Sequence, residues 1–189
     1  MNHREAEFGA IRRDIARIAN ALGIEVSDIR DDLPIQIVST GFPFIYVPLR
    51  TIDALARCAP NQTALAALFD DGDTRLPIYM FVVKEQVPLV VRARMFAPHT
   101  DNIAEDPATG SAAAPFGAYA AAHGLIKPEP NRTFLIQQGV EMGRPSEILV
   151  EVTRKENGAL GIRIGGRCAI VGEGAMFLER PATSAPRRA

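Results

Sequence analysis

The chain has 189 residues, of which 47% are hydrophobic and 23% charged, and its formal net charge is −1 at pH 7. This length fits one large domain, or one ordinary domain with extensions, and the apolar content is enough for a real core. With this near-neutral net charge the chain has no overall positive field to attract nucleic acid.

The first half of the chain predicts one helix, a bent pair of strands and two short helices. Apolar residues recur at helical spacing over 11–22, and Gly23 is a natural stop. The segment 34–49, PIQIVSTGFPFIYVPL, is rich in β-branched and aromatic residues, so we expect two short strands with a bend at 39–43. The short helices are expected at 51–58 and 61–69.

The second half predicts strands around one long helix. A loop at 97–110 leads into the apolar segment 111–126, and the polar, proline-containing tail 180–189 is expected to be disordered. Overall the order of elements predicts the α/β class, as a mixed α+β domain with mostly antiparallel neighbours. The expected strands are 76–83, 89–96, 133–137, 147–153, 160–164 and 169–178.

No Asp, Glu, Lys or Arg occurs between Ser111 and Ile126. A helix without a charged face has no side to give to water, so it should be buried all round. Most of its residues are Ala or Gly, which lets neighbouring strands approach closely. We therefore expect a central helix wrapped by a curved sheet. Proline is tolerated near a helix start but is costly in the interior, so Pro115 places the first turn near 110–114.

The start of this helix is the best candidate for a ligand site. Its first N–H groups lack helical partners, and together with the positive end of the helix dipole they favour an anion, either a carboxylate or a phosphate. The side chains there are small, so a ligand oxygen can reach the backbone. The N–H groups expected to be free belong to Gly110, Ser111, Ala112 and Ala113.

Asp106 stands just before this turn and has three possible roles. It could cap the turn, bind or orient a substrate group, or transfer a proton. A helix N-terminus stabilises the carboxylate form, which suits an orienting group better than a general acid. Ser111 could be an N-cap or a ligand-binding residue, but no GxSxG elbow surrounds it, so a hydrolase triad is not expected.

Two further segments and one histidine are weaker candidates. The bend containing Ser39, Thr40 and Gly41 could be a β-bulge or a ligand contact. Arg144, in the segment QQGVEMGRPSE, could pair locally in a turn or clamp a carboxylate. His99 lies in the loop before Asp106 and is the histidine that we would test.

The remaining polar signals favour structural roles. His123 lies at the end of the apolar helix, and the histidines show no metal-ligand spacing. Cys58 and Cys168 are expected to be reduced thiols packed in or near the core.

The sequence has no P-loop and no GxGxxG motif, so neither a metal nor a nucleotide cofactor is expected. The charged start lacks a secretory signal and the longest apolar run, 42–49, is far shorter than a membrane span, so we expect a cytoplasmic protein without a membrane partner.

Several ordered motifs resemble the phenazine-biosynthesis PhzF-like family. They are EDPATGSA at 105–112, the preceding RMFAP, the later QQGVEMGRPSEI, and VSTGFPFIYVPL at 38–49. The family is more distantly similar to diaminopimelate epimerases and proline racemases. Those enzymes use a pair of cysteines, and no cysteine lies in the motif here, so cysteine-based racemisation is not expected.

The resemblance implies a diaminopimelate epimerase-like domain, in which a curved sheet surrounds a central helix. Family members have two such domains with the active site in the cleft between them, and they move protons and double bonds in small carboxylic acids without a cofactor. The Asp and Ser of the motif line the site, which implies catalytic roles for Asp106 and Ser111. Thr109, Gly110 and Ala112 would then help to hold the substrate carboxylate.

The chain resembles only the second domain of that family. We expect an extension derived from the interdomain linker at 1–10, the second domain at 11–179, and the tail at 180–189. The glutamate that the first domain brings as acid/base has no counterpart ahead of Phe8. The sequence therefore favours half of an isomerase, completed by a separate first-domain polypeptide. The alternatives are a non-catalytic small-carboxylate-binding domain or remnant that forms a homodimer, and a homodimer with a new site across its interface.

Overall fold

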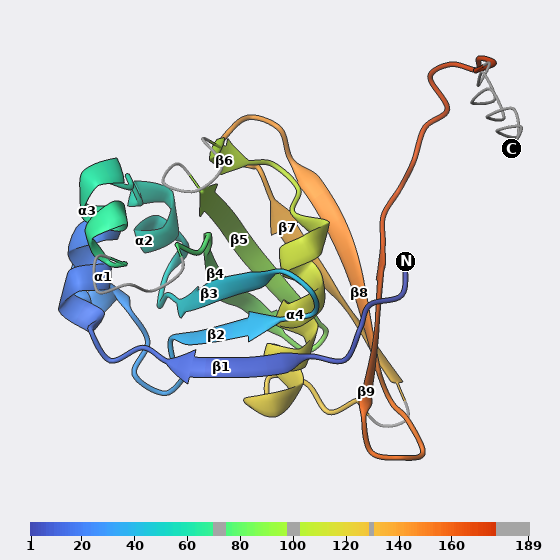
Figure 1. Cartoon of the computed structure of the whole chain (residues 1–189), viewed down its shortest axis with the longest axis horizontal. Coiled ribbons are helices and arrows are strands. Elements are labelled where there is room, and N and C mark those ends of the chain that lie inside the picture. The colour runs from blue at the N-terminus through green and yellow to red at the C-terminus, as the bar shows by residue number, and fades with distance from the viewer. Residues whose placement is uncertain (70–74, 98–102, 129–130, 177–189) are drawn as a thin grey trace, which may run out of the picture.

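One curved sheet and one helix inside it dominate the computed structural model, which describes residues 1–69, 75–97, 103–128 and 131–176 (Figure 1). The strands are β1 (Glu7–Ile11), β2 (Gln36–Ser39), β3 (Pro43–Pro48), β4 (Ile78–Gln86), β5 (Leu89–Ala97), β6 (Ile103–Asp106), β7 (Asn131–Gln138), β8 (Ser146–Arg154) and β9 (Leu160–Gly165). The helices are α1 (Ile15–Leu22), α2 (Ile52–Arg57), α3 (Gln62–Ala67) and α4 (Gly110–Ala122), with a short 3-10 turn at Val26–Asp28.

The strands lie in the order β1-β2-β3-β4-β5-β7-β8-β9, and β6 pairs with β5. Two neighbouring pairs, β3–β4 and β5–β7, are parallel, and the other pairs are antiparallel. The sheet curls around α4 as a half-barrel, as Figure 1 shows. The expectation of a mostly antiparallel, curved sheet around a central helix is therefore confirmed.

The first three residues join the far edge of this curved sheet. The amino group of Met1 donates to the Ile164 carbonyl at 2.8 Å, and Ile164 N–H returns a bond to the Met1 carbonyl at 2.9 Å. His3 N–H donates to the carbonyl of Ile162 at 3.1 Å. Because β1 continues from these residues and pairs with β2, the N-terminal segment connects β9 to the opposite end of the sheet (Figure 1).

Side chains that alternate along β3 and β4 pack into two separate hydrophobic cores. Phe44 and Tyr46 point to the core around α4, whereas Ile45 and Val47 point to a second core under α1, α2 and α3. This is the two-residue period of a strand that is buried on both faces. Helices therefore cover both faces of the sheet at β3 and β4, and α4 is enclosed.

Helix α4 is buried from Ala112 to Ala120, as the absence of charge predicts. Gly117 shows why small residues are needed: an added Cβ would lie 3.0 Å from Val150 Cγ1 and 3.1 Å from Val152 Cγ2. The helix begins at Gly110, within the expected first turn. Pro115 lies one turn deeper, where its missing N–H leaves the Ser111 carbonyl without a donor within the helix.

Four expectations about the elements differ from the structure. Strand β1 lies mostly within the expected extension 1–10, so the ordered sheet starts before residue 11, and the helix starts later, at Ile15. The segment expected to be a loop contains strand β6, which forms because its backbone pairs with β5. The expected strand at 169–178 is wrong over its described part, 169–176, which is exposed and has no strand partner.

The tail 180–189 lies outside the described residues. Within the ranges that the structure describes, no helix is both long and apolar enough to cross a membrane.

Candidate functional site

The loop that enters α4 is held together by a bond between two side chains of the motif. Strand β6 ends at Asp106, and Thr109 is the residue that precedes the helix. The Thr109 hydroxyl donates to Asp106 Oδ2 at 2.6 Å. Asp106 thus ties the loop together through Thr109, whose side chain makes no capping bond to the backbone of the first turn. Thr109 is the N-cap residue, so the N-cap role considered for Ser111 is wrong.

Gln138, at the end of β7, is the residue that organises this loop. Its side chain is fully buried, and its Nε2 donates to the Asp106 carbonyl at 2.7 Å and to Thr109 Oγ1 at 2.8 Å. Its Oε1 accepts from Thr109 N–H at 3.2 Å and from the Tyr79 hydroxyl at 3.3 Å. Gln138 was not among the residues predicted from the sequence. The available signal was its position at the end of a strand, directly before the glycine of QQG.

Two of the four expected free N–H groups are in fact occupied. Ala112 N–H and Ala113 N–H donate to the Thr109 carbonyl at 3.1 and 3.0 Å. Gly110 and Ser111 N–H make no hydrogen bond to another described residue, and the Ser111 side chain is exposed. An added Cβ at Gly110 would meet nothing within 4 Å, so the space beside these two N–H groups is open. A small anion can therefore reach two donors and the Ser111 hydroxyl.

The turn after β7 lies directly against the loop that precedes α4. A Cβ at Gly139 would lie 2.7 Å from the Pro107 carbonyl oxygen and 2.4 Å from the Arg144 carbonyl oxygen. The backbone of Arg144 is thus near the site, with its N–H donating to the Gly139 carbonyl at 2.9 Å. Its side chain is exposed and makes no ion pair with another described residue, so the structure does not show the local pairing that was one of the two possibilities for Arg144. The ion pair of this turn is instead Arg92–Glu141, at 3.1 Å.

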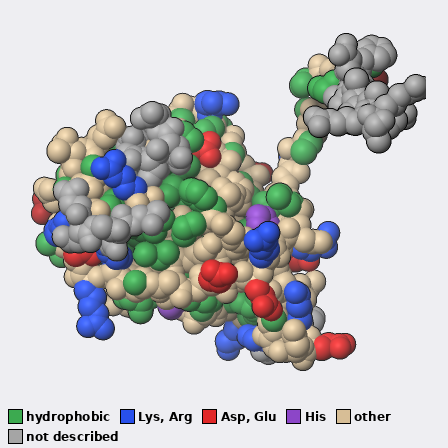
Figure 2. Space-filling view, viewed as in Figure 1, with side chains coloured by type: hydrophobic (Ala, Val, Ile, Leu, Met, Phe, Trp, Pro, Cys, Tyr) green, Lys and Arg blue, Asp and Glu red, His purple; other side chains and the backbone are tan. Residues whose placement is uncertain are grey.

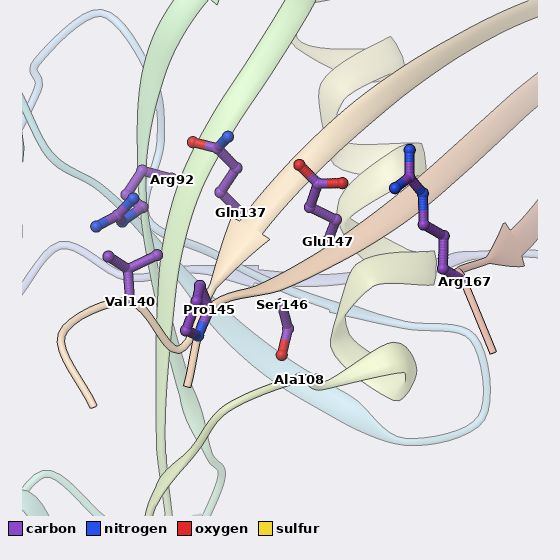
Figure 3. A pocket seen from close by; sticks show the side chains of 8 residues that line it. All are labelled: Arg92, Ala108, Gln137, Val140, Pro145, Ser146, Glu147 and Arg167. Atoms are coloured by element: carbon purple, nitrogen blue, oxygen red, sulfur yellow. The ribbon is translucent and has the colours of Figure 1, made fainter. Parts of the chain in front are cut away.

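A cavity of about 580 Å³ borders the same loop on the outer face of the sheet. Figure 3 shows Arg92, Gln137, Glu147 and Arg167 on one side of β7 and β8, with α4 behind the strands. Ala108 of the motif lines this cavity, but Asp106 and Ser111 do not. Since adjacent residues of a strand face opposite ways, Gln137 faces the cavity and Gln138 faces the loop.

The bend candidates lie in the turn between β2 and β3. Gly41 has φ +132° and its N–H donates to Ser39 Oγ at 3.0 Å, while Thr40 Oγ1 lies 3.4 Å from His3 Nδ1. No hydrogen bond between described residues links this turn to Asp106 or Ser111, so their ligand contact stays a prediction. His99 lies outside the described residues.

Tyr46 of β3 connects the same hairpin to the first turn of α4, because its buried hydroxyl donates to the Ala112 carbonyl at 2.7 Å. Burial raises the pKa of Tyr46 well above its usual value, so the hydroxyl stays protonated. Replacing Tyr46 with Phe should lower the free energy of unfolding by about 1 kcal/mol, the typical value of one hydrogen bond. Urea denaturation measures this effect, and an unchanged midpoint would show that the bond is not stabilising.

The two cysteines have different surroundings. Cys58 is buried, and burial raises its pKa to about 12. Its thiol donates to the Ala54 carbonyl, with Sγ and O 3.4 Å apart. Cys168 is exposed, so its expected packing near the core is wrong.

A thiol reagent at pH 8 should therefore modify one cysteine of the folded chain and both cysteines of the denatured chain. Cys168→Ser should abolish the fast reaction. The raised pKa of Cys58 also means that its contribution to stability is complete below the unfolded pKa and is lost as the pH rises toward 12. Equal rates for both thiols in the folded chain would contradict the buried position of Cys58.

Among the described residues, no three His, Cys, Asp or Glu side chains come together as metal ligands. His123 has the expected structural surroundings: its Nε2 lies 2.8 Å from Gln36 Oε1, and its ring packs on Tyr119 with the centroids 4.4 Å apart. Burial lowers its pKa.

The fold and this site define an epimerase-like domain with a polar motif at the start of its buried helix. Solved structures of PhzF-type proteins share this architecture. A phenazine biosynthesis protein of the PhzF family from Bacillus anthracis superposes with a TM-score of 0.75 at 24% identity, over 88% of this chain and 56% of that one. A predicted epimerase from Pseudomonas aeruginosa superposes with a TM-score of 0.66 at 28% identity, over 92% of this chain and 58% of that one.

A family model described as PhzC-PhzF, phenazine biosynthesis-like protein, matches residues 7–174, and the chain belongs to this family. An uncharacterized isomerase from Clostridium acetobutylicum is 31% identical over 90% of this chain and 57% of its own length. The trans-2,3-dihydro-3-hydroxyanthranilate isomerase of Pseudomonas fluorescens is 34% identical over 89% of this chain and 55% of its own. The chain thus spans little more than half the length of these relatives.

Proposed function

We propose that this chain supplies one wall of a cofactor-independent isomerase site that moves a proton, and with it a double bond, in a small carboxylic acid. Asp106 relays the proton or orients the group that does so. Ser111 and the N–H groups of Gly110 and Ser111 hold the substrate carboxylate. The observation that carries the proposal is the Asp106–Thr109–Gln138 network beside two N–H groups that bond to no other described residue.

The names of the relatives support the type of reaction. Two of the similar proteins are named isomerases, and the name of one specifies an anthranilate-type carboxylic acid as its substrate. A carboxylate matches what the start of α4 offers, because free N–H groups and the positive end of the helix dipole favour a bound anion.

We further propose that a partner chain completes the site. The Ser111 side chain is exposed, and nothing in the described part of the chain covers it. The segment 168–176 stands away from the body, as Figures 1 and 2 show, and its Ile170 and Val171 are 89% and 98% exposed. Apolar side chains held in water in this way favour an interface. The partner that fits best is a separate polypeptide corresponding to the other domain of a full-length relative.

Mixing the chain with a first-domain polypeptide tests the proposal that a partner chain completes the site. The chain and a first-domain polypeptide from a full-length relative are combined in deuterium oxide with trans-2,3-dihydro-3-hydroxyanthranilate, and carbon-bound deuterium is measured by NMR. Exchange should need both polypeptides. A stable complex without exchange would overturn the proposal.

The alternative is a non-catalytic domain that binds small carboxylates as a homodimer, with the exposed segment 168–176 covered by a second copy. It predicts a dimer mass in gel filtration and carboxylate binding in calorimetry without turnover. Isomerisation by the chain alone would contradict it and would instead support a site formed across two identical copies.

A further inference from the structure

Asp106 is carried by a strand that has little support of its own. Strand β6 has four residues and, among the described strands, pairs only with β5, with an irregularity in the register between its two aligned pairs. Few backbone bonds can fix so short a strand. The position of the Asp106 carboxylate therefore depends on the side chains that hold β6 from either face.

On the inner face the anchor is Gln138, whose amide bonds to the Asp106 carbonyl. On the outer face it is an ion pair. Arg94 Nε and Nη2 donate to Glu105 Oε1 and Oε2 at 2.8 and 2.9 Å, in the two-pronged geometry that is strongest for this pair. The side chains of Arg94 and Glu105 are only 9% and 13% exposed, so water screens the pair little.

Arg94 is itself fixed to the rest of the fold. Its Nη1 donates to the carbonyls of Leu55, Ala56 and Cys58, at 2.9, 3.2 and 3.0 Å, where α2 ends. Carbonyls at a helix end lack partners within the helix, so a guanidinium that satisfies them is held firmly. Its guanidinium also lies over the Phe96 ring, 4.7 Å from the centroid. Arg94 thus connects β6 to β5 and α2.

We propose that Arg94 and Glu105 are positioning residues for Asp106 in the isomerase site. This inference rests on the proposed function of Asp106. Neither residue touches the carboxylate of Asp106: they line a separate outer hollow of about 400 Å³, and adjacent strand residues face opposite ways. Their effect passes through the backbone of β6, which Arg94 and Gln138 hold between them.

Glu105→Gln tests the role of the pair. The amide keeps the shape of the carboxylate and one acceptor, and Arg94 keeps its three carbonyl partners, so the fold should survive. In the mixed assembly kcat should fall at least tenfold, with KM within twofold of its original value. In the chain alone, the NMR signals of the Gln138 side-chain amide should shift, because this group reports the position of the Asp106 carbonyl.

Asp14→Asn is the matched control. It neutralises the ion pair Arg12–Asp14, whose side chains are 13% and 22% exposed, and Arg12 also donates to the Leu68 carbonyl, just after α3. It should leave both kcat and the Gln138 signals unchanged. If Glu105→Gln fails to fold, Arg94→Lys takes its place, since lysine keeps the charge but loses the two-pronged contact.

The two measurements separate the positioning role from the function. Unchanged Gln138 signals in the folded variant, or equal effects of the variant and the control, would overturn the positioning role. If the unsubstituted assembly shows no exchange, the proposed function fails, while the Gln138 signals still decide whether the ion pair positions Asp106.

Discussion

Replacing Asp106 with Asn is expected to slow proton exchange in the completed assembly by about 10²–10⁴-fold, the range that a positioned acid/base group contributes. The change is nearly isosteric. The Thr109 hydroxyl donates to Asp106 Oδ2 at 2.6 Å, and the amide oxygen of asparagine can accept the same bond. Gln138 bonds to the main-chain carbonyl, which the substitution leaves in place. The loop should therefore keep its shape and lose the carboxylate.

Deuterium incorporation measured by NMR gives this rate. Asp53→Asn, on the exposed first turn of α2, is the control and should exchange at the original rate. If Asp106→Asn weakens substrate binding in calorimetry while bound substrate still exchanges at the original rate, Asp106 orients the substrate and does not transfer the proton. A loss of less than threefold in both measurements would exclude either role.

Gly139→Ala is expected to lower the free energy of unfolding by about 3 kcal/mol or more. Gly139 has φ +76°, a conformation in which a non-glycine residue is strained by about 1–3 kcal/mol. The new Cβ would also lie 2.4 Å from the Arg144 carbonyl oxygen and 2.7 Å from that of Pro107, and both are backbone atoms that cannot rotate away. The substitution should push the loop with the motif away from the turn after β7.

Gly143→Ala separates the two causes. Gly143 has a similar φ of +68°, but a Cβ there would meet nothing within 4 Å. It should therefore cost about 1 kcal/mol, from the backbone conformation alone. Urea denaturation of both variants measures the difference. Equal losses would show that the approach of Pro107 to Gly139 contributes nothing to stability.

The buried helix could be predicted from the sequence because its signal is local. The run from Ser111 to Ile126 contains no charged residue, so a helix formed by it has no face suited to water and must be buried. Pro115 limits where this helix can start. Strands β1 and β6 could not be predicted in this way. All five residues of β1 are exposed, so they show no alternation, and β6 is a strand only because it pairs with β5. Long-range pairing of this kind leaves no local pattern.

The segment 169–176 is the opposite case, because a strand was expected there from the sequence and none is present in the structure. Its β-branched and apolar residues favour a strand, yet no strand among the described residues pairs with it. A strand is stabilised by its neighbours, so its propensity alone does not form one. A partner that donates an edge to this segment would restore the expected strand.

The loop that enters the buried helix could be predicted, but the hydrogen bonds within it could not. The composition of 105–112 indicates a loop that enters a helix, and Thr109 and Ser111 are both suited to an N-cap by residue type. Which of them takes the cap determines which N–H groups stay free. That choice is fixed by Gln138, which lies 29 residues from Thr109 in the sequence and holds it in place.

The contact between Met1 and Ile164 also bears on how the chain folds. The two residues are 163 positions apart, so this contact closes the longest loop in the sheet. The entropy lost in closing a loop grows with its length, and distant pairings form late. The half-barrel should thus assemble first around α4, with the N-terminal residues docking last. The same backbone groups should open first in hydrogen exchange, before the strands around the helix separate.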